Sequence, residues 1–179
     1  MSIITVQVGQ CGNQLGSSFF QTLLEEVKDS SELIRQRVVE TYFQRHSEKA
    51  DSLSPNAVLV DMEPKVVQNC LSTKKQTHSG IVWNYDESSA FYKQGGSGNN
   101  WALGYYYYGE EEYHATTEII QRQLEKIDYF GGFQVLQSLA GGTGSGLGTH
   151  LVERLREDYA KANLINLAVW PYMTGEVVL

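Results

Sequence analysis

The sequence predicts an α/β fold with an open, mainly parallel sheet and helices on both of its faces. First, a β-branched strand over residues 3–8 precedes a segment, 15–27, in which apolar residues recur at every fourth position, as in an amphipathic helix. Second, an apolar run over residues 133–139 precedes a glycine-rich turn and a helical pattern at 147–155. Strands that alternate with helices in this way favour a parallel sheet.

Two further strands complete the predicted sheet. The apolar run at residues 57–60 ends in Asp61 and Glu63, and Pro64 then suits the first position of a helix. Residues 163–169 are predicted to be the last strand.

The remaining segments are less regular. Residues 94–101 form another glycine-rich loop, and the four tyrosines at 105–108 are assigned to packing and surface because no basic residue lies among them. Acidic residues 110–112 are expected to start a helix that runs through Ile127. The polar stretch 30–54 has no clean period and is expected to hold one or two helical turns. The four histidines occur in no metal-binding or catalytic motif.

Composition limits the classes of function. The 179 residues suit one domain with a real core, and 41% hydrophobic with 20% charged residues is typical of a globular protein. Because 21 acidic residues oppose 14 basic ones, the net charge is −7, which disfavours a nucleic-acid partner. Cys11 and Cys70 have no metal-type spacing and indicate a reducing compartment. We find no signal peptide and no membrane-spanning run, so we expect a soluble, intracellular protein without a membrane partner.

The most informative segment is residues 140–146, Ala-Gly-Gly-Thr-Gly-Ser-Gly, between a strand and its helix. Glycines let backbone N–H groups converge on an anion, and the helix N-terminus adds the positive end of its dipole. Thr143 and Ser145 can add hydroxyl donors. We interpret the segment as a phosphate-binding loop. The alternative is a tight turn, for which two or three residues would suffice.

This loop fits neither common phosphate motif. It lacks the lysine of a P-loop, because the nearest lysines, Lys126 and Lys161, lie outside it, and its glycines do not follow G-x-G-x-x-G. We therefore expect backbone amides, the helix dipole and a bound cation to balance the phosphate charge. Asp61 and Glu63 are candidate ligands of hydrated Mg²⁺, with a solvated turn as the alternative.

Polar side chains also follow the first strand. Gln10, Asn13 and Gln14 are uncharged hydrogen-bonding groups at the first turn of an open sheet, a favoured ligand position. The alternative is ordinary polarity at a helix start. At the other end, the apolar residues 177–179 stand where a further helix should begin, so we expect the chain to be cut from a larger protein.

Four segments together resemble the tubulin family. They follow the family's order and approximate spacing over essentially the whole chain: residues 8–14 (Val-Gly-Gln-Cys-Gly-Asn-Gln), 60–64 (Val-Asp-Met-Glu-Pro), 98–101 (Gly-Asn-Asn-Trp) and 141–146 (Gly-Gly-Thr-Gly-Ser-Gly). The last is shared with bacterial FtsZ, whereas the first and third are typical of eukaryotic tubulins. The resemblance implies a Rossmann-like GTPase fold. Residues 1–179 would be its N-terminal GTP-binding domain, incomplete because the core helix and the intermediate and C-terminal domains lie beyond the chain.

Within that family the chain resembles the delta branch. Ala140 stands where most tubulins have glycine, and residues 170–177 (Trp-Pro-Tyr-Met-Thr-Gly-Glu-Val) are unlike the alpha and beta forms. Residues 61–66 agree with that branch. Another minor tubulin, zeta or epsilon, is the alternative. Ala140 is compatible with a phosphate loop only if its φ is negative.

The resemblance implies roles for matching residues. From the first turn, the phosphates and the base side would be contacted by Gln10, Cys11 and Gln14. The γ-phosphate would be sensed by Ser97, Gly98 and Asn99. The glycine-rich loop would surround the phosphates with Ser138, Ala140, Gly141, Gly142, Thr143 and Gly144, and the ribose would lie beside Pro171 and Glu176. Asp61 and Glu63 would lie near Mg²⁺ and its waters.

Function follows from the same resemblance. It implies a GTP- or GDP-binding subunit of the microtubule cytoskeleton that contacts other tubulin subunits along the protofilament, in the cytoplasm and at a centriole, basal body or cilium. The residues that read guanine would lie beyond residue 179, and the acid that activates water would come from the next subunit. We therefore assign no catalytic residue. Two alternatives stay open: a self-sufficient phosphotransfer enzyme with Asp61 or Glu63 as base, and a structural module that does not hydrolyse its nucleotide.

Overall fold

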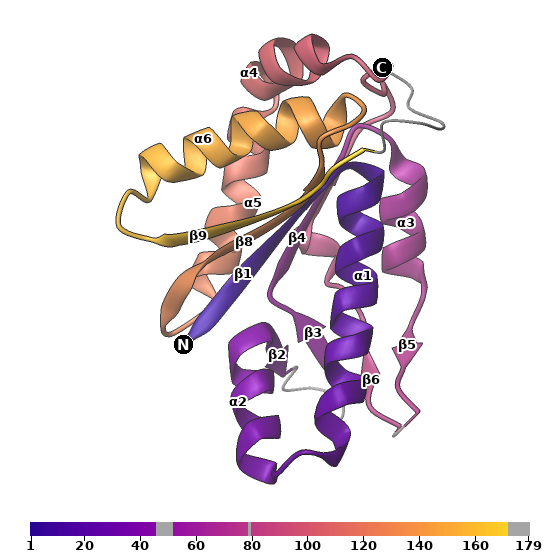
Figure 1. The fold of residues 1–179 in the computed structure, drawn as a ribbon, viewed down its shortest axis with the longest axis vertical. Helices are drawn as coiled ribbons and strands as arrows, with labels where there is room; N and C mark the ends of the chain where they lie inside the picture. The colour runs from indigo at the N-terminus through magenta and orange to yellow at the C-terminus, as the bar shows by residue number, and fades with distance from the viewer. Residues whose placement is uncertain (46–51, 79, 172–179) are drawn as a thin grey trace.

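A computed structural model describes residues 1–45, 52–78 and 80–171 of the chain. It contains a five-stranded sheet flanked by helices, and a smaller four-stranded sheet (Figure 1). The larger sheet has the strand order β7-β4-β1-β8-β9, and each pair of neighbouring strands is parallel. The predicted α/β class with a mainly parallel sheet is confirmed.

The elements have the following bounds. The larger sheet consists of β1 (Ser2–Val8), β4 (Ala57–Asp61), β7 (Ala90–Tyr92), β8 (Phe130–Ser138) and β9 (Asn163–Val169). The smaller sheet consists of β2 (Phe43–Arg45), β3 (Ser52–Pro55), β5 (Lys75–Gln76) and β6 (Val82–Trp83). The α-helices are α1 (Gly9–Glu26), α2 (Glu32–Tyr42), α3 (Pro64–Ser72), α4 (Gly109–Glu111), α5 (Tyr113–Glu125) and α6 (Gly148–Asp158). Two 3₁₀ turns, η1 (Val27–Asp29) and η2 (Glu87–Ser89), and two π-helical segments, η3 (Leu103–Tyr108) and η4 (Thr143–Leu147), complete the chain as described.

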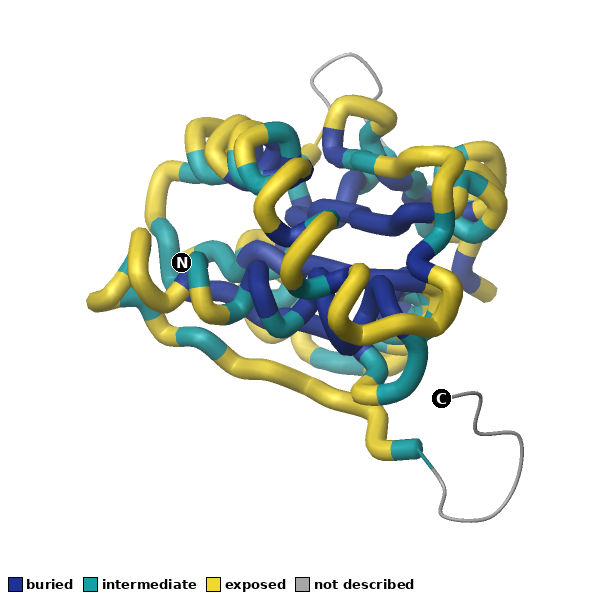
Figure 2. The backbone as a smooth tube through the Cα atoms, turned by 90° about the horizontal axis from the view of Figure 1, so that it is seen from above, coloured by how far each residue is buried: buried dark blue, intermediate teal, exposed yellow. Residues whose placement is uncertain are grey.

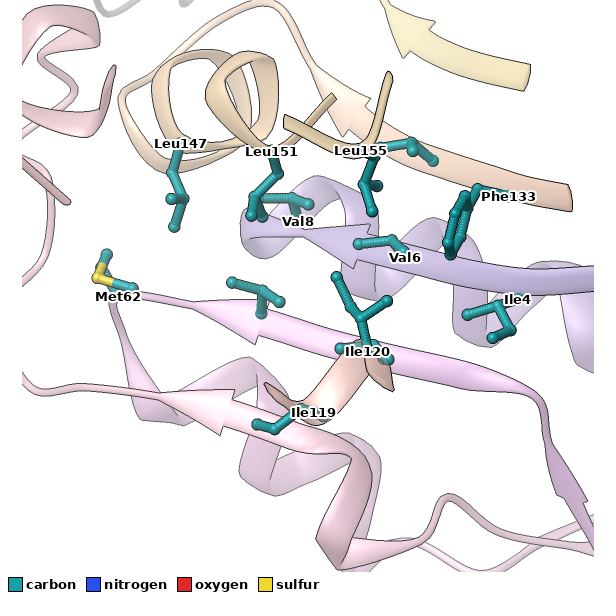
Figure 3. Close-up of a cluster of buried hydrophobic side chains, with 13 residues drawn as sticks. Ile4, Val6, Val8, Met62, Ile119, Ile120, Phe133, Leu147, Leu151 and Leu155 are labelled. Carbon is teal, nitrogen blue, oxygen red and sulfur yellow. The ribbon is translucent and has the colours of Figure 1, made fainter. Parts of the chain in front are cut away.

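Helices cover both faces of the sheet, and each face has its own buried cluster. On one face, alternate residues of the central strands pack against α5 and α6 (Figure 3). That cluster is Ile4, Val6, Val8, Val58, Val60, Met62, Ile119, Ile120, Phe133, Val135, Leu147, Leu151 and Leu155. Leu59, which lies between two of its members, packs on the opposite face with residues of α1 and α3, as the two-residue period of a strand requires.

Burial falls toward one edge of the larger sheet. The central strands are buried, whereas β9 is largely exposed (Figure 2). Ile165 of β9 is 57% exposed although the strand pairs with β8 along its whole length. The edge strand therefore contributes backbone pairing but little to the buried core.

Two helices differ from their predicted extents. Helix α1 begins at Gly9, directly after β1, so residues 9–14 form its first turns and not a separate loop. Helix α2 has eleven residues where only one or two turns were expected, and the Ser31 hydroxyl caps it by accepting a hydrogen bond from the backbone N–H of Ile34. Val39 is the only buried residue of α2, so the helix places little of its surface in the core.

The helix predicted from residues 110–112 to Ile127 is interrupted. Helix α4 is a single turn, and α5 starts afresh at Tyr113. The break occurs at Glu112, which is buried and forms an ion pair with Lys93 instead of facing solvent in a first turn. The five short strands β2, β3, β5, β6 and β7 were not predicted, because none exceeds four residues and so none shows a period. None of the helices in the described ranges has both the length and the apolar character needed to cross a bilayer.

The packing of α6 can be tested by truncating a buried side chain. Leu151 is fully buried between α6 and the sheet. We expect Leu151→Ala to lower the free energy of unfolding by about 2–5 kcal/mol, because the variant loses apolar contacts and leaves a cavity. Leu33→Ala, at a position that is 59% exposed on α2, is the matched control and should change it by about 0.5 kcal/mol or less. Urea denaturation measures both free energies of unfolding. Equal losses in the two variants would contradict the burial of Leu151 between α6 and the sheet.

Candidate functional site

The candidate site is a cleft of about 690 Å³ at the carboxyl ends of the central strands. There β1 leads into α1, β8 leads through a short loop into η4 and α6, and β4 leads into α3. The carboxyl edge of a parallel sheet is the usual place for a ligand, since helices begin there with unpaired N–H groups. Figure 1 shows the starts of α1 and α3 next to one another at this end of the molecule.

Between Gln10 and Gly144, every predicted site residue except Asn13 lines this cleft. They are Gln10, Cys11, Gln14, Asp61, Glu63, Ser97, Gly98, Asn99, Ser138, Ala140, Gly141, Gly142, Thr143 and Gly144. Pro171 does not line it, and Glu176 lies outside the described residues. The fold thus brings together four segments that are far apart in the sequence.

The first of these segments is the start of α1. Gly9 has a φ of 73°, a left-handed conformation that lets the strand turn at once into the helix. Gln10 and Gln14 are exposed, whereas Cys11 is partly buried. Burial raises the pKa of the Cys11 thiol, so it is a neutral, weakly hydrogen-bonding group and not a thiolate nucleophile.

Asn13 was expected to face a ligand, and that prediction is wrong. Its side chain is fully buried, and its amide donates to the carbonyl oxygens of Gly9 at 2.9 Å and Val60 at 3.2 Å. Asn13 therefore ties the first turn of α1 to the end of β4.

The second segment is the glycine-rich loop after β8. The Ser138 hydroxyl accepts a hydrogen bond from the backbone N–H of Ala140, and Gly141 has a φ of 84°. Asn99 is the only non-glycine residue of the described chain with a positive φ. The φ of Ala140 is therefore negative, as an alanine in a phosphate loop requires. The helical conformation begins at Thr143, inside the predicted loop.

Only one of the two hydroxyls expected to face a ligand lines the cleft. Ser145 is buried, and its hydroxyl donates to the carbonyl oxygen of Gly141, so its predicted role as a donor to phosphate is wrong. Thr143 lines the cleft, and its hydroxyl lies 2.9 Å from that of Ser97 in the third segment.

The third segment, residues 95–100, is held on the end of β4. The backbone N–H groups of Gly95 and Gly96 donate to the carbonyl oxygen of Met62, and the Tyr108 hydroxyl donates to that of Gly96 at 2.9 Å. The glycine-rich loop lies directly against this segment. A Cβ atom at Gly142 would lie 2.5 Å from Oγ of Ser97 and 2.8 Å from the backbone nitrogen of Asn100. Only glycine permits this close approach.

The fourth segment carries the two predicted metal ligands. Asp61 is 3% exposed, and its Oδ1 accepts a long hydrogen bond (3.4 Å) from the backbone N–H of Glu63. Its Oδ2 is buried and has no hydrogen-bond partner. Burial raises the pKa of Asp61 to about 6. Among the described residues no group of three or more His, Cys, Asp or Glu side chains could hold a metal alone, so a cation here would need further ligands.

Sequence reasoning missed Lys65, which also lines the cleft. A P-loop carries its lysine within the glycine-rich loop, and this loop has none. The position of Lys65 at the start of the helix that follows Asp61 and Glu63 is the sequence signal for its place in the cleft, because that helix begins at the same edge of the sheet.

The sequence matches the tubulin/FtsZ family, GTPase domain, over residues 2–179. The chain belongs to this family. It is 43% identical to the tubulin delta chain of Homo sapiens over its whole length and 42% identical to that of Mus musculus. Identity to the tubulin beta chain of Porphyra purpurea is 37% over 94% of the chain. The resemblance to the tubulin family and to its delta branch is therefore confirmed.

The match covers only part of each relative. The chain spans about 40% of the length of the delta chains and 37% of the beta chain. The described residues that line the cleft fall between Val8 and Gly144, within the matched region of this tubulin-family chain.

The close approach at Gly142 gives a direct test of the cleft. We expect Gly142→Val to lower the affinity for guanine nucleotides at least about 100-fold, because displaced loops would lose two or more charge-assisted hydrogen bonds. Gly80→Asn is the control, since Gly80 lies outside the cleft, has a φ of 90°, and a Cβ atom there would have no neighbour closer than 4.0 Å. Calorimetric titration with GDP measures both variants, and undiminished affinity in Gly142→Val would rule out the loop as a phosphate site.

The buried carboxylate predicts a pH-dependent effect on stability. Asp61 has a raised pKa of about 6, whereas an unfolded Asp titrates near ~3.9, so the ligand-free fold loses stability as the pH rises through this interval. Asp61→Asn removes the charge. We expect the variant to be more stable than the wild type by about 2–3 kcal/mol at pH 7.5 and almost equal to it at pH 4.

Urea denaturation at the two pH values measures this difference. Asp128→Asn, at an exposed site outside the cleft, is the matched control and should change the unfolding free energy by less than about 0.5 kcal/mol at either pH. A gain in Asp61→Asn that is the same at both pH values would show that charge burial is not its cause.

Proposed function

We propose that residues 1–179 are the GTP-binding domain of a delta-like tubulin subunit, and that the cleft holds the phosphates of GTP or GDP. The observation that carries this proposal is the convergence of the helix starts after β1 and β8, with their glycines, on one cleft at the carboxyl edge of the sheet. Backbone N–H groups at helix starts bind phosphate through hydrogen bonds and the positive end of the dipole. Gln10, Cys11 and Gln14 approach the ligand from α1, residues 97–99 from the third segment, and Ser138 with residues 140–144 from the glycine-rich loop.

Mg²⁺ is proposed to bind with the nucleotide, near Asp61 and Glu63. The donor set fits this ion, since the Oδ2 atom of Asp61 is a buried carboxylate oxygen without a partner and both side chains line the cleft. Two carboxylates with ligands supplied by phosphate oxygens and waters are typical of Mg²⁺ in nucleotide sites. When bound, the ion would neutralise phosphate charge.

Guanine and ribose recognition are proposed to come mainly from residues outside the cleft described above. Pro171 and Glu176 are proposed for the ribose side, and the guanine-reading groups for the remainder of a tubulin chain. The preference for guanine is an expectation from the family and does not follow from the residues that line the cleft.

Hydrolysis is proposed to need a second subunit. Among the described residues that line the cleft, the only carboxylates are Asp61 and Glu63, and both serve better as cation ligands, since a bound cation would keep them ionised and weakly basic. A neighbouring tubulin in the protofilament would supply the general base. By resemblance to delta chains, we propose that the subunit works in the cytoplasmic microtubule cytoskeleton, at centrioles, basal bodies or cilia.

One observation favours a second candidate, a self-contained phosphotransfer enzyme. The pKa of Asp61, raised to about 6, is close to the value that suits a general base near neutral pH. In that case hydrolysis by a dilute monomer would be lost in Asp61→Asn. A third outcome, tightly bound nucleotide without turnover, would indicate a structural module.

The deciding experiment has two steps. Mass analysis of the nucleotide released from the purified full-length protein identifies the ligand, and we expect GDP or GTP. Steady-state hydrolysis is then measured against protein concentration, and we expect the rate to rise faster than linearly because the site is completed by assembly. A strictly linear rate in a demonstrably monomeric sample would contradict completion by a neighbour and support the self-contained enzyme.

A further inference from the structure

Lys65 stands apart from the other groups of the cleft by its charge. Among the described residues that line the cleft, Lys65 is the only basic side chain, and the acidic side chains are Asp61 and Glu63. A nucleoside triphosphate would bring several further negative charges to this cleft. Lys65 is the residue of this described lining that offers them a full positive charge.

The backbone of Lys65 is held firmly. Pro64 and Lys65 open α3, whose residues Val67 and Cys70 are buried in the cluster beneath α1. No side chain caps the start of α3, so its first N–H groups have no side-chain acceptor. Lys65 and Val66 of this first turn both line the cleft. The start of α3 therefore joins those of α1 and η4 as a third helix N-terminus at the site.

The ammonium group of Lys65, by contrast, has no partner of its own. Its side chain is exposed, and no carboxylate of the described residues lies within ion-pair distance of it. Other lysines are engaged: Lys93 pairs with Glu112, and Lys126 pairs with Asp86. Glu63 does not neutralise Lys65, because its carboxylate lies beside Gly96 on the third segment.

We propose that Lys65 is a phosphate ligand of the cleft, and that its charge makes affinity rise with the number of phosphate groups on the bound nucleoside. This inference rests on the proposed function. A lysine ammonium binds phosphate as a compact point charge on a flexible stem, which suits a group that reaches in from the rim. The lysine that is missing from the glycine-rich loop is thus supplied by the first turn of α3.

The test compares guanosine, GDP and GTP as ligands of the full-length protein. Lys65→Met removes the charge and keeps much of the length of the side chain, and Lys65→Arg keeps the charge. Lys74→Met is the matched control, since Lys74 is also exposed and lies outside the cleft. Calorimetric titrations at two salt concentrations give the affinities, and thermal unfolding checks that each variant is folded.

We expect Lys65→Met to weaken GTP and GDP binding about tenfold or more, with the larger loss for GTP, and to leave guanosine binding unchanged. The salt dependence of GTP binding should also become weaker, because one charge contact is removed. Lys65→Arg should restore most of the affinity, and Lys74→Met should match the wild type.

Two results would overturn the inference alone: GTP affinity in Lys65→Met equal to that of Lys74→Met, or an equal loss for guanosine, GDP and GTP, which would indicate a structural role. Wild-type protein that binds no guanine nucleotide would overturn the proposed function, and this inference with it.

Discussion

The cleft depends on backbone contacts that leave no room for a Cβ atom. A Cβ at Gly9 would lie 2.8 Å from the backbone nitrogen of Gly144, and one at Gly142 would collide with Ser97 and Asn100. Gly104 in η3 is equally confined, since its Cβ would overlap the carbonyl oxygen of Gly142. Three separate parts of the chain can therefore approach one another only because each places a glycine at the contact.

Further contacts connect the segments that line the cleft. The hydroxyls of Ser97 and Thr143 meet at 2.9 Å, and the Met62 carbonyl holds the N–H groups of Gly95 and Gly96. A shift of any one segment would displace the others, because packed backbone has little freedom to adjust. A ligand that needs several N–H donors in fixed positions benefits from this, since the ordering is complete before it binds.

Charge in the cleft is divided between the backbone and a few side chains. Three helix starts direct partial positive charge toward it, while Asp61 and Glu63 add negative charge on one side. The pKa of Asp61 is raised because burial disfavours its charged form, and one of its oxygens has no hydrogen-bond partner. Such a group is poorly satisfied in the ligand-free fold, and a cation or a bound ligand with its waters would satisfy it.

The fold class, the strands β1, β4, β8 and β9 and the glycine-rich loop could be predicted from the residues alone, because buried strands and amphipathic helices have apolar patterns that are visible along the chain. Short motifs that match a family also identified most of the residues that line the cleft, but not Lys65. The partners of individual polar groups follow from the tertiary structure: Asn13 and Ser145 donate to backbone carbonyls, and Lys65 is brought to the lining of the cleft. The reason is physical, since the partner of a polar side chain is set by atoms distant in the chain, which no local pattern records.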